Sequence, residues 1–339
     1  MKAIGFTEHL PINNPRSLFE FQTPLPEPRP HDLLVKVTAV AVNPVDTYVR
    51  KGGRGKLKSP KIIGYDACGT VTKVGTAVSL FHPGDRVFYA GSILRPGSNS
   101  EYQLVDERIV GHAPHTLSDA QAAAMPLTSL TAYEALFEQL GIDRRPQKNA
   151  GKTILIINGA GGVGSVATQL ARLAGLTVIA TASRPAGVKW TKEHGAHFVV
   201  NHHQDLVKQV HARGYQYVDY VLGLSSIDDH WQEMCQLIKP NGAISSITEN
   251  RRPINLRLLT KKRAHFAWEW MYTKSYYSTP DMVTQHQILD RVAQLLDERV
   301  LTCTLSKELI PLNAANLRKA HQLVEGGHMI GKVAIAGWE

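Results

Sequence analysis

Three glycines spaced G-x-G-x-x-G carry the clearest chemistry in this chain. Gly159, Gly161 and Gly164 follow the apolar, β-branched run Thr153–Asn158 and precede a segment whose apolar side chains recur at helical spacing. Strand, glycine turn and helix in this order are typical of a dinucleotide-binding site, in which the glycines allow a tight turn, a close approach to pyrophosphate and close packing of helix on strand. The helix N-terminus attracts the phosphates. We expect these residues of the turn to bind the cofactor: Gly159, Ala160, Gly161, Gly162, Val163 and Gly164.

The end of the next predicted strand indicates which nicotinamide cofactor is bound. NAD-specific sites place Asp or Glu there to bind the ribose hydroxyls, but this strand ends Thr181-Ala-Ser-Arg184, with no carboxylate before Glu193. Ser183 can donate a hydrogen bond to a 2′-phosphate, and Arg184 can form a charge-assisted pair with it. Lys189 is a weaker candidate for binding the same 2′-phosphate. We therefore predict NADPH rather than NADH, although Arg184 is also compatible with an exposed arginine at a helix start.

Positioning these residues requires a parallel sheet, and the sequence pattern predicts one. From about Pro126 the chain alternates strands with helical segments, which favours a doubly wound α/β sheet of the Rossmann type over 126–274. Residues 1–125 are β-rich. In the segment from 275 onward, strands and helices no longer alternate regularly, so we expect this segment to pack with residues 1–125. The predicted strands of the middle part are Thr153–Asn158, Thr177–Ala182, Phe198–Asn201, Val218–Gly223, Ala243–Thr248 and Ala264–Trp268.

Composition restricts the class of protein. A chain of 339 residues with 43% hydrophobic and 20% charged residues is typical of a globular protein of two domains. The net charge of +9 is spread along the chain, and the sequence contains no known nucleic-acid-binding motif. We therefore expect no nucleic-acid partner. Cys68, Cys235 and Cys303 are far apart, which favours a reduced, cytoplasmic chain without disulfides. The sequence predicts neither a signal peptide nor a membrane span.

Short motifs along nearly the whole chain occur in a specific order. They are Asn43-Pro-Val-Asp-Thr-Tyr48, Gly64-Tyr-Asp66, Gly69-Thr-Val71, Val74-Gly75, Pro83-Gly-Asp-Arg-Val87, Leu130-Thr-Ala-Tyr133, Thr181-Ala-Ser-Arg184, Phe266-Ala-Trp-Glu-Trp-Met271 and Gly331-Lys332. With these residues in place, the chain resembles the medium-chain dehydrogenase/reductase superfamily, and within it the zinc-independent quinone oxidoreductase-like branch. The sub-branch it resembles most is the one named zinc-type alcohol dehydrogenase-like proteins. The resemblance implies a GroES-like β domain built from 1–125 and 275–339, with the Rossmann domain inserted.

The resemblance also implies further cofactor contacts. Asn43 and Thr131 are expected near the nicotinamide, His202 near the adenosine, and Lys332 at the phosphates. Later strand ends are expected to line the groove, and each of these positions alone is also compatible with simple packing. The groove residues are Gly223, Ile247, Phe266 and Trp268.

No zinc is expected, despite the sub-branch's name. The positions that correspond to zinc ligands in relatives are Asn43, the pair Tyr65-Asp66, and Leu127. An amide, a phenol and an alkyl chain cannot form a closed shell around this metal. No cysteine occurs at 91–100, where the resemblance would place a structural zinc lobe.

Without a Lewis acid, the easier reaction is hydride addition to an electron-poor acceptor. We predict an NADPH-dependent reductase of a quinone or an α,β-unsaturated carbonyl. Tyr48 is the first candidate to contact the substrate oxygen, with Asp46 and Asn43 as further catalytic candidates, although Asp46 is also compatible with a turn residue after Pro44. The residues expected to line the substrate pocket are Tyr48, Tyr65, Trp268 and Trp270.

Two other functions remain open from the sequence. One is a zinc-dependent alcohol dehydrogenase, and the other is an NADPH-binding sensor or partner protein without significant turnover. An exposed Rossmann edge strand and the resemblance together favour a homodimer or homotetramer.

Overall fold

The computed structural model describes all 339 residues, which divide into two compact units. Unit 1 combines Met1–Leu127 with Tyr272–Glu339, and unit 2 comprises Thr128–Met271. The chain therefore leaves unit 1, builds unit 2 and returns. No helix is both long and apolar enough to cross a membrane.

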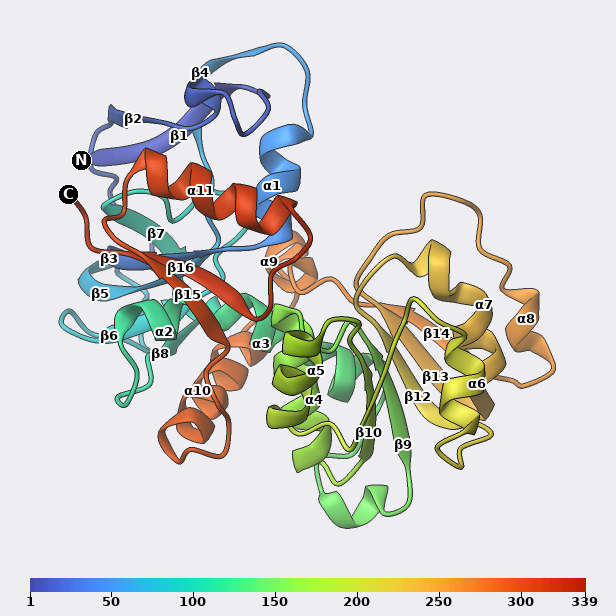
Figure 1. The fold of residues 1–339 in the computed structure, drawn as a ribbon. Coiled ribbons are helices and arrows are strands. Elements are labelled where there is room, and N and C mark those ends of the chain that lie inside the picture. Colours follow the sequence, from blue (N-terminus) through green and yellow to red (C-terminus); the bar gives the residue numbers. More distant parts are fainter. The chain divides into compact units, whose positions relative to one another are not determined.

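Unit 1 consists of two sheets, which Figure 1 shows in blue and cyan with the returning C-terminal segment in red. A small antiparallel sheet has the order β2-β1-β4, and a larger one has the order β15-β16-β3-β5-β6-β8, with β7 paired to β3. The strands are β1 (Lys2–Glu8), β2 (Phe19–Gln22), β3 (Asp32–Val42), β4 (Lys56–Ile62), β5 (Asp66–Val74), β6 (Arg86–Tyr89), β7 (Tyr102–Asp106), β8 (Val110–His112), β15 (Leu305–Leu309) and β16 (Lys332–Ala336).

The returning segment is joined to unit 1 by strand pairing. β16 pairs antiparallel with β3, with Val333 opposite Val42, and β5 pairs with β3 so that Asp66 lies opposite Ala41. This register brings Lys332, Asn43 and Asp66 to one end of three adjacent strands. The helices of this unit are α1 (Pro44–Lys51), α2 (Asp119–Ala123), α9 (Thr273–Tyr277), α10 (Thr284–Asp297) and α11 (Ala314–Glu325).

Unit 2 is a parallel sheet with the strand order β11-β10-β9-β12-β13-β14. Numbered from β9, this is the order 3-2-1-4-5-6 that defines the Rossmann fold. The strands are β9 (Thr153–Ile157), β10 (Thr177–Thr181), β11 (Phe198–Val200), β12 (Val218–Gly223), β13 (Ile238–Ser246) and β14 (His265–Trp268).

Helices connect the strands of unit 2, as Figure 1 shows. The predicted α/β fold class is confirmed. The predicted strands agree with the observed ones to within one residue at each end, except for β13. This strand begins at Ile238 rather than Ala243 and ends at Ser246 rather than Thr248, and a register shift lets Ile238 pair with Val218. The helices are α3 (Pro126–Tyr133), which crosses from unit 1 into unit 2, α4 (Gly162–Leu173), α5 (Pro185–Glu193), α6 (Leu206–His211), α7 (Ile227–Leu237) and α8 (Arg257–Thr260).

Candidate active site

The glycine turn lies between β9 and α4, with no room for side chains at two of its glycines. A Cβ at Gly159 would lie 2.8 Å from the Cβ of Ala180, and a Cβ at Gly164 would lie 2.2 Å from the backbone oxygen of Asn158. These close approaches allow α4 to begin directly at the strand end. Residues 160–163 are only half-buried, so their backbone remains accessible to a ligand.

Parallel pairing brings the ends of the strands to the same edge of the unit 2 sheet. Gly223 lies opposite Ile157 and Ser246, and Ser246 lies opposite Trp268. The Ile247 N–H, one residue after β13, donates to the Gly223 oxygen at 3.2 Å. The sequence-predicted residues Gly223, Ile247 and Trp268 are thus at neighbouring strand ends.

Thr181 ties three of these strand ends together. Its Oγ1 accepts a hydrogen bond of 2.8 Å from the Asn158 N–H and lies 3.1 Å from Nδ1 of His202. The turn after β9, the end of β10 and the segment after β11 are therefore connected through one hydroxyl. His202 is held beside the glycine turn, at the edge where the sequence predicts the cofactor.

The end of β10 presents the residues predicted to select NADPH. Ser183 is half-buried, and Arg184 is exposed at the N-cap position of α5. Lys189 is also exposed, and its Nζ lies 3.8 Å from a carboxylate oxygen of Glu193. The first turn of α5 contains no acidic residue, so no negative charge of this helix opposes an anion at its start.

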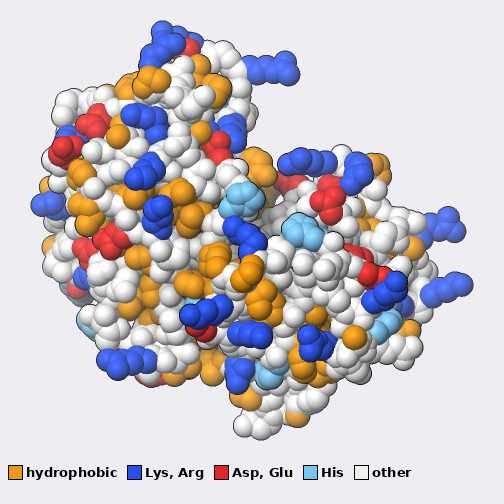
Figure 2. Space-filling view, in the orientation of Figure 1, with side chains coloured by type: hydrophobic (Ala, Val, Ile, Leu, Met, Phe, Trp, Pro, Cys, Tyr) orange, Lys and Arg blue, Asp and Glu red, His pale blue; other side chains and the backbone are white.

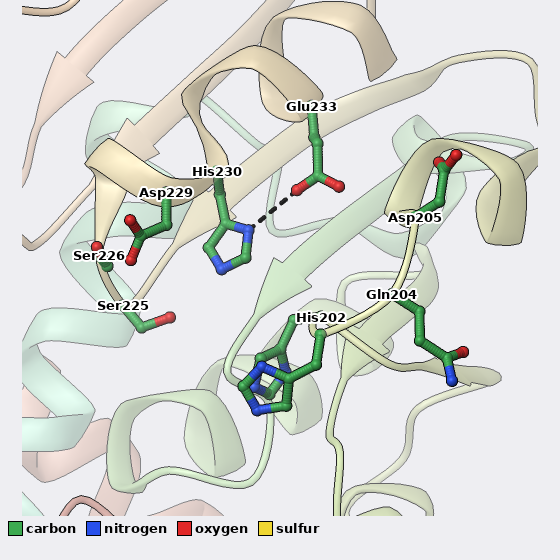
Figure 3. Close-up of a pocket in the computed structure, with 9 residues that line it drawn as sticks. His202, Gln204, Asp205, Ser225, Ser226, Asp229, His230 and Glu233 are labelled. Atoms are coloured by element: carbon green, nitrogen blue, oxygen red, sulfur yellow. Dashed lines mark hydrogen bonds and ion pairs between the residues drawn. The ribbon is translucent and has the colours of Figure 1, made fainter.

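A cavity of about 570 Å³ opens in unit 2 between the segment after β11 and the N-terminal half of α7. Figure 3 shows His230 and Glu233 of α7 on one side of the cavity and His202 on the other, with Nδ1 of His230 3.0 Å from Oε2 of Glu233. Sequence reasoning found only His202 of this group. Its lining residues are His202, His203, Gln204, Asp205, Ser225, Ser226, Asp229, His230 and Glu233.

The remaining residues predicted in unit 2 differ in exposure. Thr131 on α3 is buried, and Phe266 is half-buried with its ring 4.8 Å from that of Trp268 in an edge contact. Trp268 and Trp270 are both exposed, with 44% and 42% of their surfaces accessible. Exposed tryptophans are available to contact a ligand, which a core position would not allow.

In unit 1, a buried polar cluster forms where β3, β5 and β16 end. Asn43, Asp46, Asp66 and Lys332 are each at most 4% exposed. Nζ of Lys332 contacts Oδ2 of Asp66 at 2.9 Å, the Val42 oxygen at 3.2 Å, and Oδ1 of Asn43. Asp66 also accepts from Nδ2 of Asn43 at 2.8 Å and from the Leu127 N–H at 2.7 Å.

In this structure Lys332 belongs to the buried cluster, whereas the resemblance implies that it reaches the cofactor phosphates. An ammonium has three N–H donors, and those of Lys332 are taken by the three acceptors of the cluster. Sequence reasoning missed these partners because the pairing of β16 with β3 joins residues 289 positions apart.

Asp46 and Tyr48 lie on α1, which begins directly after Asn43. Oδ2 of Asp46 accepts a 2.8 Å hydrogen bond from the Asn43 backbone N–H, while Oδ1 has no hydrogen-bond partner. Burial raises the pKa of Asp46 to about 7. Tyr48 is 64% exposed, so its phenol is open to a substrate.

Tyr65 packs inside unit 1. Its ring makes an edge contact with that of Tyr272, with centroids 5.5 Å apart, and both residues are 2% exposed. Burial, together with the negative charge of Asp46, raises the pKa of both phenols. The phenols therefore stay protonated at neutral pH. In this structure, no group of three or more His, Cys, Asp or Glu side chains is arranged to hold a metal ion.

Comparison with known proteins gives the same architecture. Residues 29–115 match the alcohol dehydrogenase GroES-like domain, and residues 162–285 match the zinc-binding dehydrogenase family. A zinc-type alcohol dehydrogenase-like protein of Staphylococcus epidermidis is 42% identical over 335 residues, which cover 99% of each chain.

Two solved structures extend this similarity. A protein of Rhizobium etli, provisionally described as a zinc-dependent alcohol dehydrogenase, is 47% identical and superposes with a TM-score of 0.95 over 100% of this chain and 98% of that one. Quinone oxidoreductase of Escherichia coli, solved with NADPH, is 25% identical with a TM-score of 0.82 over 99% of this chain and 100% of that one. The chain therefore belongs to the medium-chain dehydrogenase/reductase superfamily of oxidoreductases, among the zinc-type alcohol dehydrogenase-like proteins.

Proposed function

We propose that the protein binds NADPH along the strand ends of unit 2 and reduces a quinone or an α,β-unsaturated carbonyl without a metal ion. The observation that carries the cofactor assignment is the end of β10. Ser183 and Arg184 offer a hydrogen-bond donor and a cation at the start of α5. No Asp or Glu occurs between Thr181 and Glu193. A 2′-phosphate gains a charge-assisted pair there, whereas a carboxylate in this place would repel it.

We propose that the adenosine binds in the cavity beside His202, near the same edge of the sheet. Asp205, Asp229 and Glu233 line it, and their negative charges disfavour a phosphate inside it. The flat base and the ribose can instead meet the histidine rings and serine hydroxyls. We propose that the phosphates lie at the glycine turn, with the accessible backbone of residues 160–163.

The residues at the positions that correspond to zinc ligands in relatives do not form a zinc site in this protein. Asn43 and Asp66 each bind the buried ammonium of Lys332, so their oxygens already hold a cation. Tyr65 is a phenol whose pKa is raised by burial, and Leu127 has no donor atom in its side chain. Zinc prefers thiolate, imidazole and carboxylate ligands in a tetrahedral shell. We therefore propose that the reaction uses no metal.

When bound, the reduced nicotinamide supplies the hydride. A conjugated acceptor spreads the arriving negative charge over its own π-system, so it needs less help than a simple ketone. Tyr48 lies exposed on α1 and can donate a hydrogen bond to the acceptor oxygen. The buried cluster fixes the start of α1 through Asn43, so we propose that Asn43 positions this helix rather than contacting the reacting atoms.

The expected partner is a small molecule. On the face shown in Figure 2, basic side chains are interspersed with acidic and apolar ones rather than gathered into one patch. We propose a homodimer or homotetramer, because β14 is an edge strand of the unit 2 sheet whose outer side pairs with no other strand.

The test is NADPH oxidation with a panel of quinones and enones, using protein purified without a histidine tag and analysed for zinc. We expect NADPH consumption with at least one conjugated acceptor and less than one zinc ion per ten chains. A zinc-dependent alcohol dehydrogenase would instead carry one tightly held zinc per chain and oxidise simple alcohols. NADPH binding without consumption across the panel would indicate a sensor.

A further inference from the structure

The buried cluster of unit 1 contains two carboxylates and one cation. Asp46 and Asp66 are 1% and 0% exposed, and Lys332 is 4% exposed. A buried charge is costly unless it is paired and hydrogen-bonded. The distribution of hydrogen bonds therefore decides which carboxylate can be ionised.

Asp66 has the partners of an ionised carboxylate. Its Oδ2 accepts from Lys332 at 2.9 Å and from Asn43 at 2.8 Å, and its Oδ1 accepts from the Leu127 N–H at 2.7 Å. The three acceptors of Lys332 are Asp66, Asn43 and Val42, so none of its N–H groups reaches Asp46. The single cation of the cluster belongs to Asp66.

Asp46 has the surroundings of a neutral acid. It accepts one backbone hydrogen bond at Oδ2, and its Oδ1 is buried without a partner. The other titratable groups whose charges act on it or feel its charge are Lys332 of β16, Asp66 of β5, and the phenols of Tyr65 and Tyr272. Lys332 favours its ionisation and Asp66 opposes it, while burial has the largest effect and raises its pKa.

We propose that Asp46 is an uncharged acid in the working protein, and that its ionisation slows the reduction by adding a second negative charge to the buried cluster. The second half of this statement rests on the proposed function. Hydride addition gives the acceptor a negative charge, and a buried carboxylate on the helix that presents Tyr48 opposes that charge. Asp46 is only 1% exposed, so it acts through the electric field of its carboxylate and is a positioning residue.

The protonation state can be measured without any substrate. Infrared difference spectra between acidic and alkaline samples of the intact protein report the carbonyl stretch of a protonated carboxylic acid. We expect such a band to be present at neutral pH, to disappear at alkaline pH, and to be missing in Asp46→Asn. A matched control is Asp32→Asn, because Asp32 is equally buried but is paired with Arg95 at 2.7 Å and 2.8 Å. The control should keep the band.

The functional half is tested by the pH profile of NADPH oxidation. We expect kcat of the natural protein to fall by about tenfold per pH unit on the alkaline side of this ionisation, and Asp46→Asn to remove that fall. A band that persists in Asp46→Asn, or that is absent from the natural protein at neutral pH, overturns the assignment of the proton. An alkaline fall that persists in Asp46→Asn overturns the link to catalysis. Absence of NADPH oxidation with every acceptor contradicts the proposed function and leaves the infrared result to decide the charge of Asp46.

Discussion

The polar cluster of unit 1 and the cavity of unit 2 contain similar residue types but use them differently. In unit 1, Lys332 forms hydrogen bonds with Asp66 and Asn43 in the interior, and at most 4% of each residue is exposed. In unit 2, the side chains around His202 line an open cavity of about 570 Å³. The buried cluster pairs its own charges and fixes the start of α1, whereas the open cavity is available to bind a ligand. Changes in the cluster should therefore affect folding stability most, and changes around the cavity should affect cofactor binding.

The largest expected effect follows from removing the cation of the cluster. Lys332→Met leaves Asp66 buried without its counter-ion, and we expect a loss of about 3–5 kcal/mol in the free energy of unfolding. The double variant Lys332→Met/Asp66→Asn removes both charges and should recover most of that loss. Urea unfolding measures both values. Equal destabilisation of the single and double variants would show that the ion pair is not the source of the effect.

The next largest effects are expected at two buried carboxylates, Asp46 and Asp32, whose pKa values are shifted in opposite directions. The pKa of Asp46 is raised to about 7, so the folded state binds its proton more tightly than the unfolded state does, and this group lowers stability as the pH rises from about 4 to about 7. At 1.36 kcal/mol per pKa unit this amounts to roughly 4 kcal/mol at alkaline pH. Asp46→Asn should therefore be more stable than the natural protein at pH 8, and the difference should shrink toward pH 4.

Asp32 gives the reverse case. Burial alone would raise its pKa, but hydrogen bonding and attraction from Arg95 outweigh burial and hold the pKa below its usual value. Its contribution to stability is present above about pH 4 and is lost as the pH falls through its lowered pKa. Asp32→Asn should therefore lower stability at pH 7 by up to about 3 kcal/mol. Unfolding curves at several pH values check both variants, and the same sign for both would contradict the assigned charges.

A smaller effect is expected where the cofactor's 2′-phosphate is proposed to bind. Arg184→Glu replaces an attractive charge with a repulsive one, so we expect NADPH to bind about 100-fold more weakly while NADH binding changes little. Lys192→Glu is a matched control, because it makes the same charge change at an exposed lysine in the last turn of the same helix. Titration calorimetry with both nucleotides measures the preference. Equal losses in the two variants would point to long-range charge rather than to direct contact at Arg184.

The smallest effect concerns the cavity. Ser225→Leu places a larger side chain in its lining, and we expect about tenfold weaker NADPH binding through lost contact with the adenosine, with stability changed by less than about 1 kcal/mol. Calorimetry and urea unfolding separate the two quantities. Unchanged affinity would move the adenosine out of this cavity.

The comparison also shows which features a sequence reveals. The glycine turn and the order of the strands in unit 2 could be predicted because they depend on local patterns, namely apolar runs, helical spacing and the spacing of Gly159, Gly161 and Gly164. The residues after Gly223 follow the same strand-end rule, so Ser225 and His230 could have been found by extending it past β12. Their role in lining a cavity depends on how α7 packs, which local patterns do not give.

The cluster in unit 1 could not be predicted in this way. The sequence drew attention to Asn43, Asp46 and Lys332 individually, but their hydrogen bonds depend on the pairing of β16 with β3 and of β5 with β3. Such pairings join distant segments, and nothing near Lys332 in the sequence identifies its partners.

The proposed function depends most on hydride transfer from NADPH to a conjugated acceptor without a metal ion. The most direct measurement is steady-state NADPH oxidation by protein shown to be free of zinc, with a quinone and an enone as acceptors. We predict turnover that is unchanged by added zinc or by a chelator and that is lower with NADH. Oxidation that appears only after zinc is added, or no affinity for either nucleotide, would contradict the account.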